Sequence, residues 1–461
     1  MSYLLLIAVV YFLHLLLKMN WICTGILFLY GIWSLSRHKK VLRGQKFQEE
    51  RFFAVSLYLD TVLYAFLKEE KIDGALRDTA RTMPEGIMKR EVERVAEKIM
   101  IAADDEQVME AALRELEEAF PCKRMRDVHN FMLHVEYYGG EIARPVQLLL
   151  EDKGRWERRI QKTMEERKKK RMDVILSVIA SLLICGVILY RPVLDIDIST
   201  NILVQIITVL LVMIDDLVLR KAQKYLNQDW LALRLGEEGN KYVKKMEELR
   251  KYDEQKEKRL SNILGTFALV ITGICLFLGK YWIVAMGLFL ALFLFQQHRL
   301  GHALLRKNLV KEIQYAFPNW LLDLILLLQS ENVQIALEKS LTFAPAILRR
   351  EVEDLLERLH MDPESSEPFH GFLKEFSIPQ IHSAMSGLYG LTIGNSHKGD
   401  KQMNELVEKN LELLDVAESR KLSESVAGMY LLFLAPVLLA SFKLVVDMAI
   451  LMIRFIQNPM L

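Results

Sequence analysis

Cysteine is scarce in this chain, and the spacing of its cysteines excludes two kinds of site. The 461 residues include four cysteines and no CxxC pair. Neither a zinc site nor a disulfide framework is therefore indicated. Cys23, Cys185 and Cys275 fall inside apolar stretches, and Cys122 lies in a charged segment. We expect four reduced thiols.

Motifs of common enzymes are also missing. The chain contains no GxxxxGK[ST] phosphate loop, no HExxH metal motif and no GxSxG nucleophile elbow. The missing phosphate loop argues against nucleotide hydrolysis by this chain. His129 and His134 lie on an amphipathic helical stretch without further ligands, so we expect them to be structural. The sequence therefore predicts a non-enzyme with no catalytic residues, no cofactor and no metal site.

Strand-type alternation is absent, whereas long apolar stretches alternate with very charged ones. Hydrophobic residues make up 52% of the chain and the mean hydropathy is +0.15, with a net charge of +1. This segregation is typical of a membrane protein with soluble domains. Between the apolar stretches, apolar residues recur at helical spacing, as in Phe52, Val55, Leu59, Val62, Leu63 and Phe66. The predicted fold class is an all-α polytopic membrane protein with seven or eight transmembrane helices.

The alternation divides the chain into seven segments. Basic residues follow the first apolar pair directly, at Arg37–Lys40, which places the soluble segments in the cytoplasm by the positive-inside tendency. The predicted segments are a transmembrane hairpin at 1–36, a cytoplasmic helical domain at 37–172, a hairpin at 173–219, a charged helical linker at 220–261, a hairpin at 262–296, a second cytoplasmic helical domain at 297–425, and a C-terminal transmembrane part at 426–461.

The last apolar segment has two possible foldings. As a single helix it exceeds the thickness of the hydrocarbon core, and as a hairpin around Lys443 it matches the first pair of spans. We favour the hairpin, with Lys443 and Asp447 at an outer turn; the alternative is that the two residues pair inside the bilayer. Asp215 and Asp216 lie near an inner boundary and are adjacent in sequence, thus on different helix faces. We expect simple interfacial residues; the alternative is an intramembrane acid pair.

One stretch of the sequence occurs twice. ALRDTARTMPEGIMKREVERVAEKI spans Ala75–Ile99, and ALEKSLTFAPAILRREVEDLLERL spans Ala336–Leu359, an offset of about 260 residues. Pro84 and Pro345 take the same place in the two copies, where a helix is expected to begin or end. Because this period is too long for a solenoid, the repeat indicates a duplicated domain.

Two further features complete the first copy. Glu136 precedes the pair Gly139–Gly140, which predicts a helix C-cap or a tight turn. A charged helix then leads into the next apolar stretch through five consecutive basic residues: Arg167, Lys168, Lys169, Lys170 and Arg171. Such side chains either anchor a helix at anionic lipid headgroups or meet an acidic partner.

The repeated unit resembles the type II secretion system F-domain family. The resemblance rests on the two AL pairs with their prolines, the REVE segments, the late glycine pair and the basic helix that enters the next span. The order of spans and soluble domain is similar to the TadB/TadC-like platform proteins of Tad/Flp pilus assembly, here with the unit duplicated. In the second copy, YGLTIG at Tyr389–Gly394 replaces the glycine pair.

The resemblance implies a function and a set of partners. It implies a multi-pass platform protein of the bacterial inner membrane, in contact with a cytoplasmic secretion or pilus ATPase and with pilin or pseudopilin subunits. It also implies a homo-oligomer in the lipid membrane, with no nucleic acid among its partners. Two alternatives are a transporter subunit, which would require a polar pathway, and a membrane-anchored scaffold or sensor, which would require a signalling module.

Overall fold

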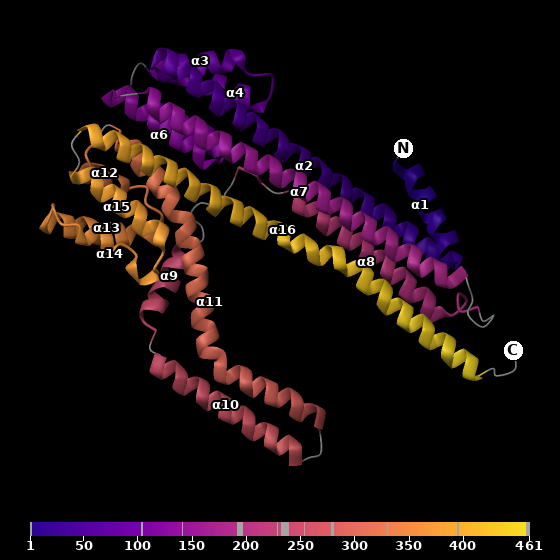
Figure 1. Ribbon diagram of the computed structural model, residues 1–461. Helices are drawn as coiled ribbons and strands as arrows, with labels where there is room; N and C mark the ends of the chain where they lie inside the picture. The colour runs from indigo at the N-terminus through magenta and orange to yellow at the C-terminus, as the bar shows by residue number, and fades with distance from the viewer. Residues whose placement is uncertain are drawn as a thin grey trace. The chain divides into compact units, whose positions relative to one another are not determined.

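The computed structural model is helical throughout the part of the chain that it describes. Every element there is a helix and no strand is present, which confirms the all-α expectation (Figure 1). The described residues are 2–102, 105–140, 142–190, 197–227, 229–231, 239–252, 254–277, 281–329, 331–393 and 396–457. They form two compact units. Unit 1 comprises Met1–Val128, Leu149–Leu233 and Ser419–Leu461, and unit 2 comprises His129–Leu148 and Arg234–Glu418.

A small helical bundle forms one end of unit 1. The long helix α2 (Trp21–Glu69) is followed by α3 (Ile72–Thr82), α4 (Ile87–Ala102) and α5 (Glu106–Ala119), each packed on its neighbour. The predicted stripe on α2 is fully buried, since all six of its side chains have no exposed surface. Trp156 of α7 (Ala143–Tyr190) packs edge-on against Phe52, with ring centroids 4.9 Å apart. The stripe therefore forms the core of this bundle.

The helix boundaries follow the residue types that the sequence places there. Pro84 lies between α3 and α4, and Pro121 lies between α5 and α6 (Lys123–Tyr138). Asp105 caps α5, because its carboxylate accepts hydrogen bonds from the backbone N–H groups of Gln107 (3.0 Å) and Val108 (3.4 Å). The prediction that Pro84 lies at a helix boundary is confirmed.

The other end of unit 1 is an apolar helix bundle. It contains α1 (Ser2–Leu16), the N-terminal half of α2, the C-terminal half of α7, α8 (Ile202–Leu226) and the C-terminal part of α16 (Ser396–Gln457). Gln205 fixes one end of this apolar bundle. Its amide group accepts from the N–H of Asn20 (3.0 Å) and donates to the carbonyls of Lys18 (2.9 Å) and Ser199 (2.7 Å). The turn after α1 and the segment before α8 thus lie at the same end.

The C-terminal helix corrects one prediction. α16 runs from Ser396 to Gln457 without a break, so the hairpin around Lys443 is wrong. Lys443 and Asp447 lie one turn apart on this helix and bond to each other. The segment around Lys443 contains no glycine and no proline to support a turn, and the ion pair satisfies both charges within a continuous helix.

The number of membrane-crossing helices also differs from the expectation. By length and composition, two helices among the described residues are able to cross a membrane: Ile202–Leu226 and the segment Lys401–Gln457 of α16. Two shorter apolar helices are Tyr3–Leu16 and Gly287–Gln297. The described part of the chain therefore does not support a count of seven or eight. The junctions at 191–196 and 278–280 lie outside the described residues.

Unit 2 has its own aromatic core. The helices α10 (Glu254–Phe277) and α11 (Tyr281–Leu327) pack as a hairpin, and the rest of the unit contains α9 (Gly239–Arg250), α12 (Val333–Ser340), α13 (Ala346–Met361), α14 (Glu367–Gly371), the 3₁₀ helix η2 (Lys374–Phe376) and α15 (Pro379–Ile393). Trp320 stacks on Phe372 with ring centroids 5.8 Å apart, and its indole N–H donates to Ser340 Oγ (3.2 Å).

The succession of helices repeats along the chain. A long helix, a short helix and a 16-residue helix occur as α2, α3 and α4, and again as α11, α12 and α13. The pairs Ala75–Leu76 and Ala336–Leu337, which mark the sequence repeat, occupy α3 and α12 and are fully buried. The copies differ where α5 stands, because the short α14 and η2 take its place. The repeat thus extends from sequence to helix order.

Candidate functional site

The glycine pair ends α6, as the sequence predicts. Gly139 has φ +70° and Gly140 has φ +134°, and the N–H of Gly139 donates to the carbonyl of Val135 (2.8 Å). These φ values lie in the region that side chains other than glycine rarely adopt. Both glycines are exposed, and Glu136 lies one turn earlier on α6, half-buried. The pair fixes the direction in which the chain leaves α6.

Replacing Gly139 with alanine is expected to lower the free energy of unfolding by about 1–2 kcal/mol, the cost of a left-handed backbone for an L residue. Nothing lies within 4 Å of the position of a Cβ atom there, so the effect is conformational alone. Gly139→Asn is the matched control and should cost less, because asparagine tolerates this conformation. Urea unfolding followed by circular dichroism measures both; an alanine variant as stable as the wild type would contradict the positive φ.

The basic run on α7 divides into buried and exposed members. Arg167 has no exposed surface, donates to the carbonyl of Tyr225 (2.8 Å) and lies over the ring of Trp230 at 4.7 Å. Burial lowers the pKa of Arg167 to about 10, so its guanidinium stays charged at neutral pH. Arg171 donates to Gln223 Oε1 (3.1 Å).

The other three members face outward to different extents. Lys170 pairs with Asp173 (3.2 Å) and is half-buried, whereas Lys168 and Lys169 are exposed. Lys168 lies 3.2 Å from Glu49 on α2. A partner protein that binds this basic run therefore contacts Lys168 and Lys169. Arg167 and Arg171 instead bond to residues of α8 and stabilise the packing of α7 on α8.

The two repeat prolines are boundary residues. Pro84 is exposed in the connection between α3 and α4, and Pro345 is the residue before α13, with φ −53° and ψ 142°. Both stand where a missing backbone N–H removes no helical hydrogen bond. Their observed role is to set where a helix starts.

An ion pair lies inside the apolar bundle of unit 1. Lys443 and Asp447 on α16 both have no exposed surface, and Lys443 Nζ donates to Asp447 Oδ2. Around them are buried apolar residues of the same bundle, including Ala440 and Leu451. The placement at an outer turn is therefore wrong, and the internal pairing that the sequence left as the alternative is observed.

Asp215 lies in the same interior, and its neighbour Asp216 does not. Asp215 is 2% exposed, and its Oδ2 accepts a hydrogen bond from Ser181 Oγ on α7 (3.2 Å). Asp216 accepts from Ser34 Oγ (2.8 Å) on α2 and pairs with Arg220 (3.0 Å). The two aspartates point to different faces as predicted, and Asp215 is buried because its face of α8 packs against α7.

Cys185 connects Asp215 with the ion pair. Cys185 is 2% exposed on α7, one turn after Ser181, and it interacts electrostatically with Lys443, Asp447 and Asp215. We name these five residues, Ser181, Cys185, Asp215, Lys443 and Asp447, the buried ionic cluster. The sequence signal for the cluster was the pair of opposite charges at Lys443 and Asp447, spaced i, i+4 within an apolar stretch. Such a pair is compatible with an internal ion pair as well as with a turn.

The carboxylates of this cluster are not fully satisfied. Asp215 Oδ1 and Asp447 Oδ1 are both buried and accept no hydrogen bond from any residue that the structure describes. An ionised carboxylate can accept about four hydrogen bonds, and leaving one short of partners in a dry environment is unfavourable. Two carboxylate oxygens of the buried ionic cluster therefore lack a hydrogen-bond donor among the described residues.

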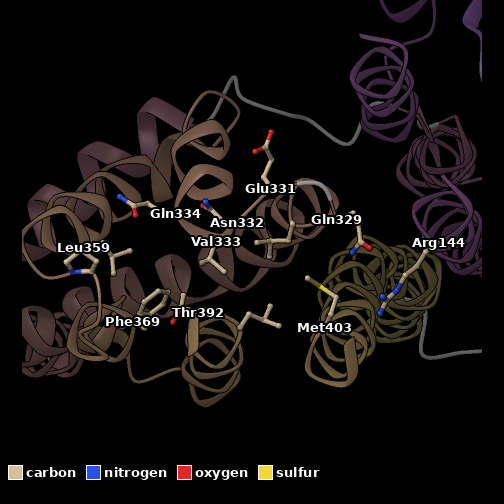
Figure 2. A pocket seen from close by; sticks show the side chains of 13 residues that line it. Arg144, Gln329, Glu331, Asn332, Val333, Gln334, Leu359, Phe369, Thr392 and Met403 are labelled. Atoms are coloured by element: carbon tan, nitrogen blue, oxygen red, sulfur yellow. The ribbon is translucent and has the colours of Figure 1, made fainter. Parts of the chain in front are cut away.

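Unit 2 contains a separate pocket of about 590 Å³. Figure 2 shows its lining, which contains both polar and apolar side chains. Arg144 donates to Asn404 Oδ1 there, and Glu331 contributes the carboxylate of the lining. The remaining residues at the pocket are Leu328, Gln329, Asn332, Val333, Gln334, Leu359, Pro363, Phe369, Leu391, Thr392 and Met403.

Metal-binding geometry is not found in the described part of the chain, where no three His, Cys, Asp or Glu residues cluster to hold an ion. Cys23, Cys122 and Cys185 are free thiols, and the side chain of Cys275 lies outside the described residues. His129 is buried, and the ring of His134 lies tilted by 37° against that of Tyr138, with ring centroids 5.1 Å apart. Burial is the main cause that lowers the pKa of His134.

Comparison with known proteins adds no relative. No family model, no curated protein and no solved structure matches this chain. The protein is therefore described by its own architecture, in which the described residues form helices in a repeated order. In unit 1, the small bundle around Phe52 and Trp156, which we name the charged bundle, shares its long helices α2 and α7 with the apolar bundle.

Proposed function

We propose that this chain is a non-enzymatic platform protein of a secretion or pilus assembly machine of the type II secretion and Tad/Flp class. In this role it sits in the bacterial inner membrane with its charged helical bundles in the cytoplasm. It couples a cytoplasmic ATPase to the extraction of pilin or pseudopilin subunits from the bilayer. The proposal rests on the F-domain resemblance of the repeated unit together with one structural observation.

That observation is the continuity of the long helices in unit 1. α7 has 48 residues and α2 has 49, which is a length of about 72 Å at 1.5 Å per residue. One half of each helix packs in the charged bundle, through Phe52 and Trp156, and the other half packs in the apolar bundle. A helix is stiff along its axis, so a displacement of the charged bundle moves the apolar bundle with it.

The proposed topology has seven membrane segments. They are α1, the part of α2 before Arg37, the part of α7 after Arg171, α8, the C-terminal half of α10, the N-terminal half of α11 and the C-terminal half of α16. Support comes from the positions of charge within unit 1. Arg37 lies over the ring of Trp33 at 4.0 Å, and Arg220 lies over the same ring at 4.9 Å, as expected of residues at an inner headgroup layer.

Crosslinking in native membranes tests the proposal, followed by purification of the protein and mass spectrometry of what accompanies it. Recovery of a secretion ATPase together with small single-span pilin-like proteins is the expected result. Recovery of solute-transport or signalling subunits, with no ATPase of that class, would overturn it.

The exposed lysines give a sharper test of ATPase contact. Lys168→Gln with Lys169→Gln should reduce ATPase recovery several-fold, since a pair of exposed charges steers an acidic surface and is screened by salt. The matched control is Lys224→Gln with Lys221→Gln, which removes two lysines from α8. Quantitative mass spectrometry of the crosslinked material is the readout; unchanged ATPase recovery would contradict a contact at this surface.

The buried ionic cluster favours a second candidate function, a subunit that moves a cation across the membrane. Ionisable residues inside an apolar helix bundle commonly line ion or proton pathways. This candidate predicts cation flux in proteoliposomes that contain the purified chain alone, whereas the platform proposal predicts none.

A further inference from the structure

The buried ionic cluster contains one more acid than base. Lys443 and Asp447 neutralise each other through a direct bond on α16. Among the described residues Asp215 has no such counter-ion. Its Oδ2 accepts a hydrogen bond from the neutral hydroxyl of Ser181 at 3.2 Å. Asp215 is nevertheless 2% exposed. With all three groups ionised, the cluster carries one negative charge in the interior of the bundle.

Among the residues that the structure describes, none is observed to pair with Asp215 and balance that charge. On α7, Cys185 and Ser181 face the interior, and on α16 the charged residues are Lys443 and Asp447. On α8 itself, Asp216 and Arg220 form a pair on the other face. On α2, Tyr30 donates to Asp216 Oδ2 (2.9 Å) rather than to Asp215. A lone carboxylate in such a place takes up a proton more readily than one in water, because burial disfavours the ionised form.

We propose that the buried ionic cluster is a proton-binding site, in which Asp215 takes up an exchangeable proton below neutral pH while Asp447 remains ionised beside Lys443. The proton comes from water: an O–H bond forms at Asp215 Oδ1 and one O–H bond of a hydronium ion breaks. The protonated Oδ1 is the atom that accepts no hydrogen bond from the described residues. This inference does not depend on which machine the chain serves.

Protonation has a structural consequence within unit 1. It removes the uncompensated charge between α7 and α8, and so stabilises the packing of these two helices on α16. Ser177 Oγ already donates to the carbonyl of Phe433 (2.7 Å), which fixes α7 against α16 one turn before Ser181. Loss of the proton leaves a buried anion beside that contact. The site thereby links proton occupancy to the packing of α16.

Infrared difference spectroscopy of the full-length protein in lipid nanodiscs tests the proposal. At mildly acidic pH the wild type should show the carbonyl stretching band of a protonated carboxylic acid in an apolar environment, and the band should weaken as the pH rises above neutral. Asp215→Asn should abolish this band and keep the wild-type melting temperature, because the amide resembles the protonated acid in shape and charge. Asp216→Asn is the matched control and should keep the band, since Asp216 is paired with Arg220.

Two results would overturn the proposal. One is a spectrum without the band, or with a band that survives in Asp215→Asn. The other is a wild-type melting temperature that rises with sodium or potassium at constant ionic strength and no longer does so in Asp215→Asn, which would assign a metal ion to the site. If Asp215→Asn fails to fold, Ser181→Ala serves instead: it removes the hydrogen bond to the carboxyl group and should shift the frequency of the band without abolishing it.

Discussion

Lys443→Met is expected to lower the free energy of unfolding by about 3–5 kcal/mol, the usual effect of removing one partner of a buried ion pair. The size follows from what the change leaves behind. Methionine fills the space of the lysine stem, but Asp447 keeps its charge with no exposed surface and without its counter-ion. Thermal or denaturant unfolding of the purified protein in detergent, followed by circular dichroism, measures the loss.

A double replacement separates the pair from its surroundings. Lys443→Met with Asp447→Leu removes both charges and keeps the apolar volume, so it should be neutral or stabilise the protein by up to about 4 kcal/mol. The expected pattern is therefore a severe single variant that is rescued by the double variant. A single variant as stable as the wild type would contradict the burial of the pair.

Lys169→Pro is expected to abolish the export of pilin or pseudopilin subunits while the protein remains in the membrane. Proline removes a backbone hydrogen bond and clashes with the preceding turn, at a cost of about 3 kcal/mol, and kinks the helix. Lys169 is exposed and lies on α7 between Trp156 of the charged bundle and the apolar half. The substitution thus changes the stiffness of α7 without removing a core side chain.

Lys169→Ala is the control, because it removes the charge and leaves the helix intact. The readout is the amount of exported subunit per cell, with the protein quantified in the membrane fraction. Wild-type export by the proline variant would show that an unbroken α7 is not needed. Equal loss in the alanine variant would assign the effect to the charge instead.

Structural features that depend on a single helix could be predicted from the sequence. The stripe from Phe52 to Phe66 is buried because its period matches one helix face. The glycine pair after α6 adopts positive φ because a helix end needs it. Each of these signals lies within a few residues of the feature that it predicts.

The buried ionic cluster was not readable in this way, because its members come from three helices. Asp215 and Asp216 differ in environment only through the neighbours of α8: Ser181 faces the one and Ser34 faces the other. No periodicity within α8 states which helix packs on which face. Likewise, the sequence around Lys443 is compatible with a turn and with an internal ion pair. The packing of Lys443 in the apolar bundle distinguishes the two.

Position-specific photocrosslinking in living cells tests the platform proposal most directly. A photoreactive residue in place of Lys169, exposed on the charged half of α7, should capture the cytoplasmic ATPase. The same residue in place of Leu183, which is 48% exposed on the apolar half, should capture a small single-span pilin-like subunit. Capture of only transport or signalling proteins at both positions would contradict a platform that joins an ATPase to pilin extraction.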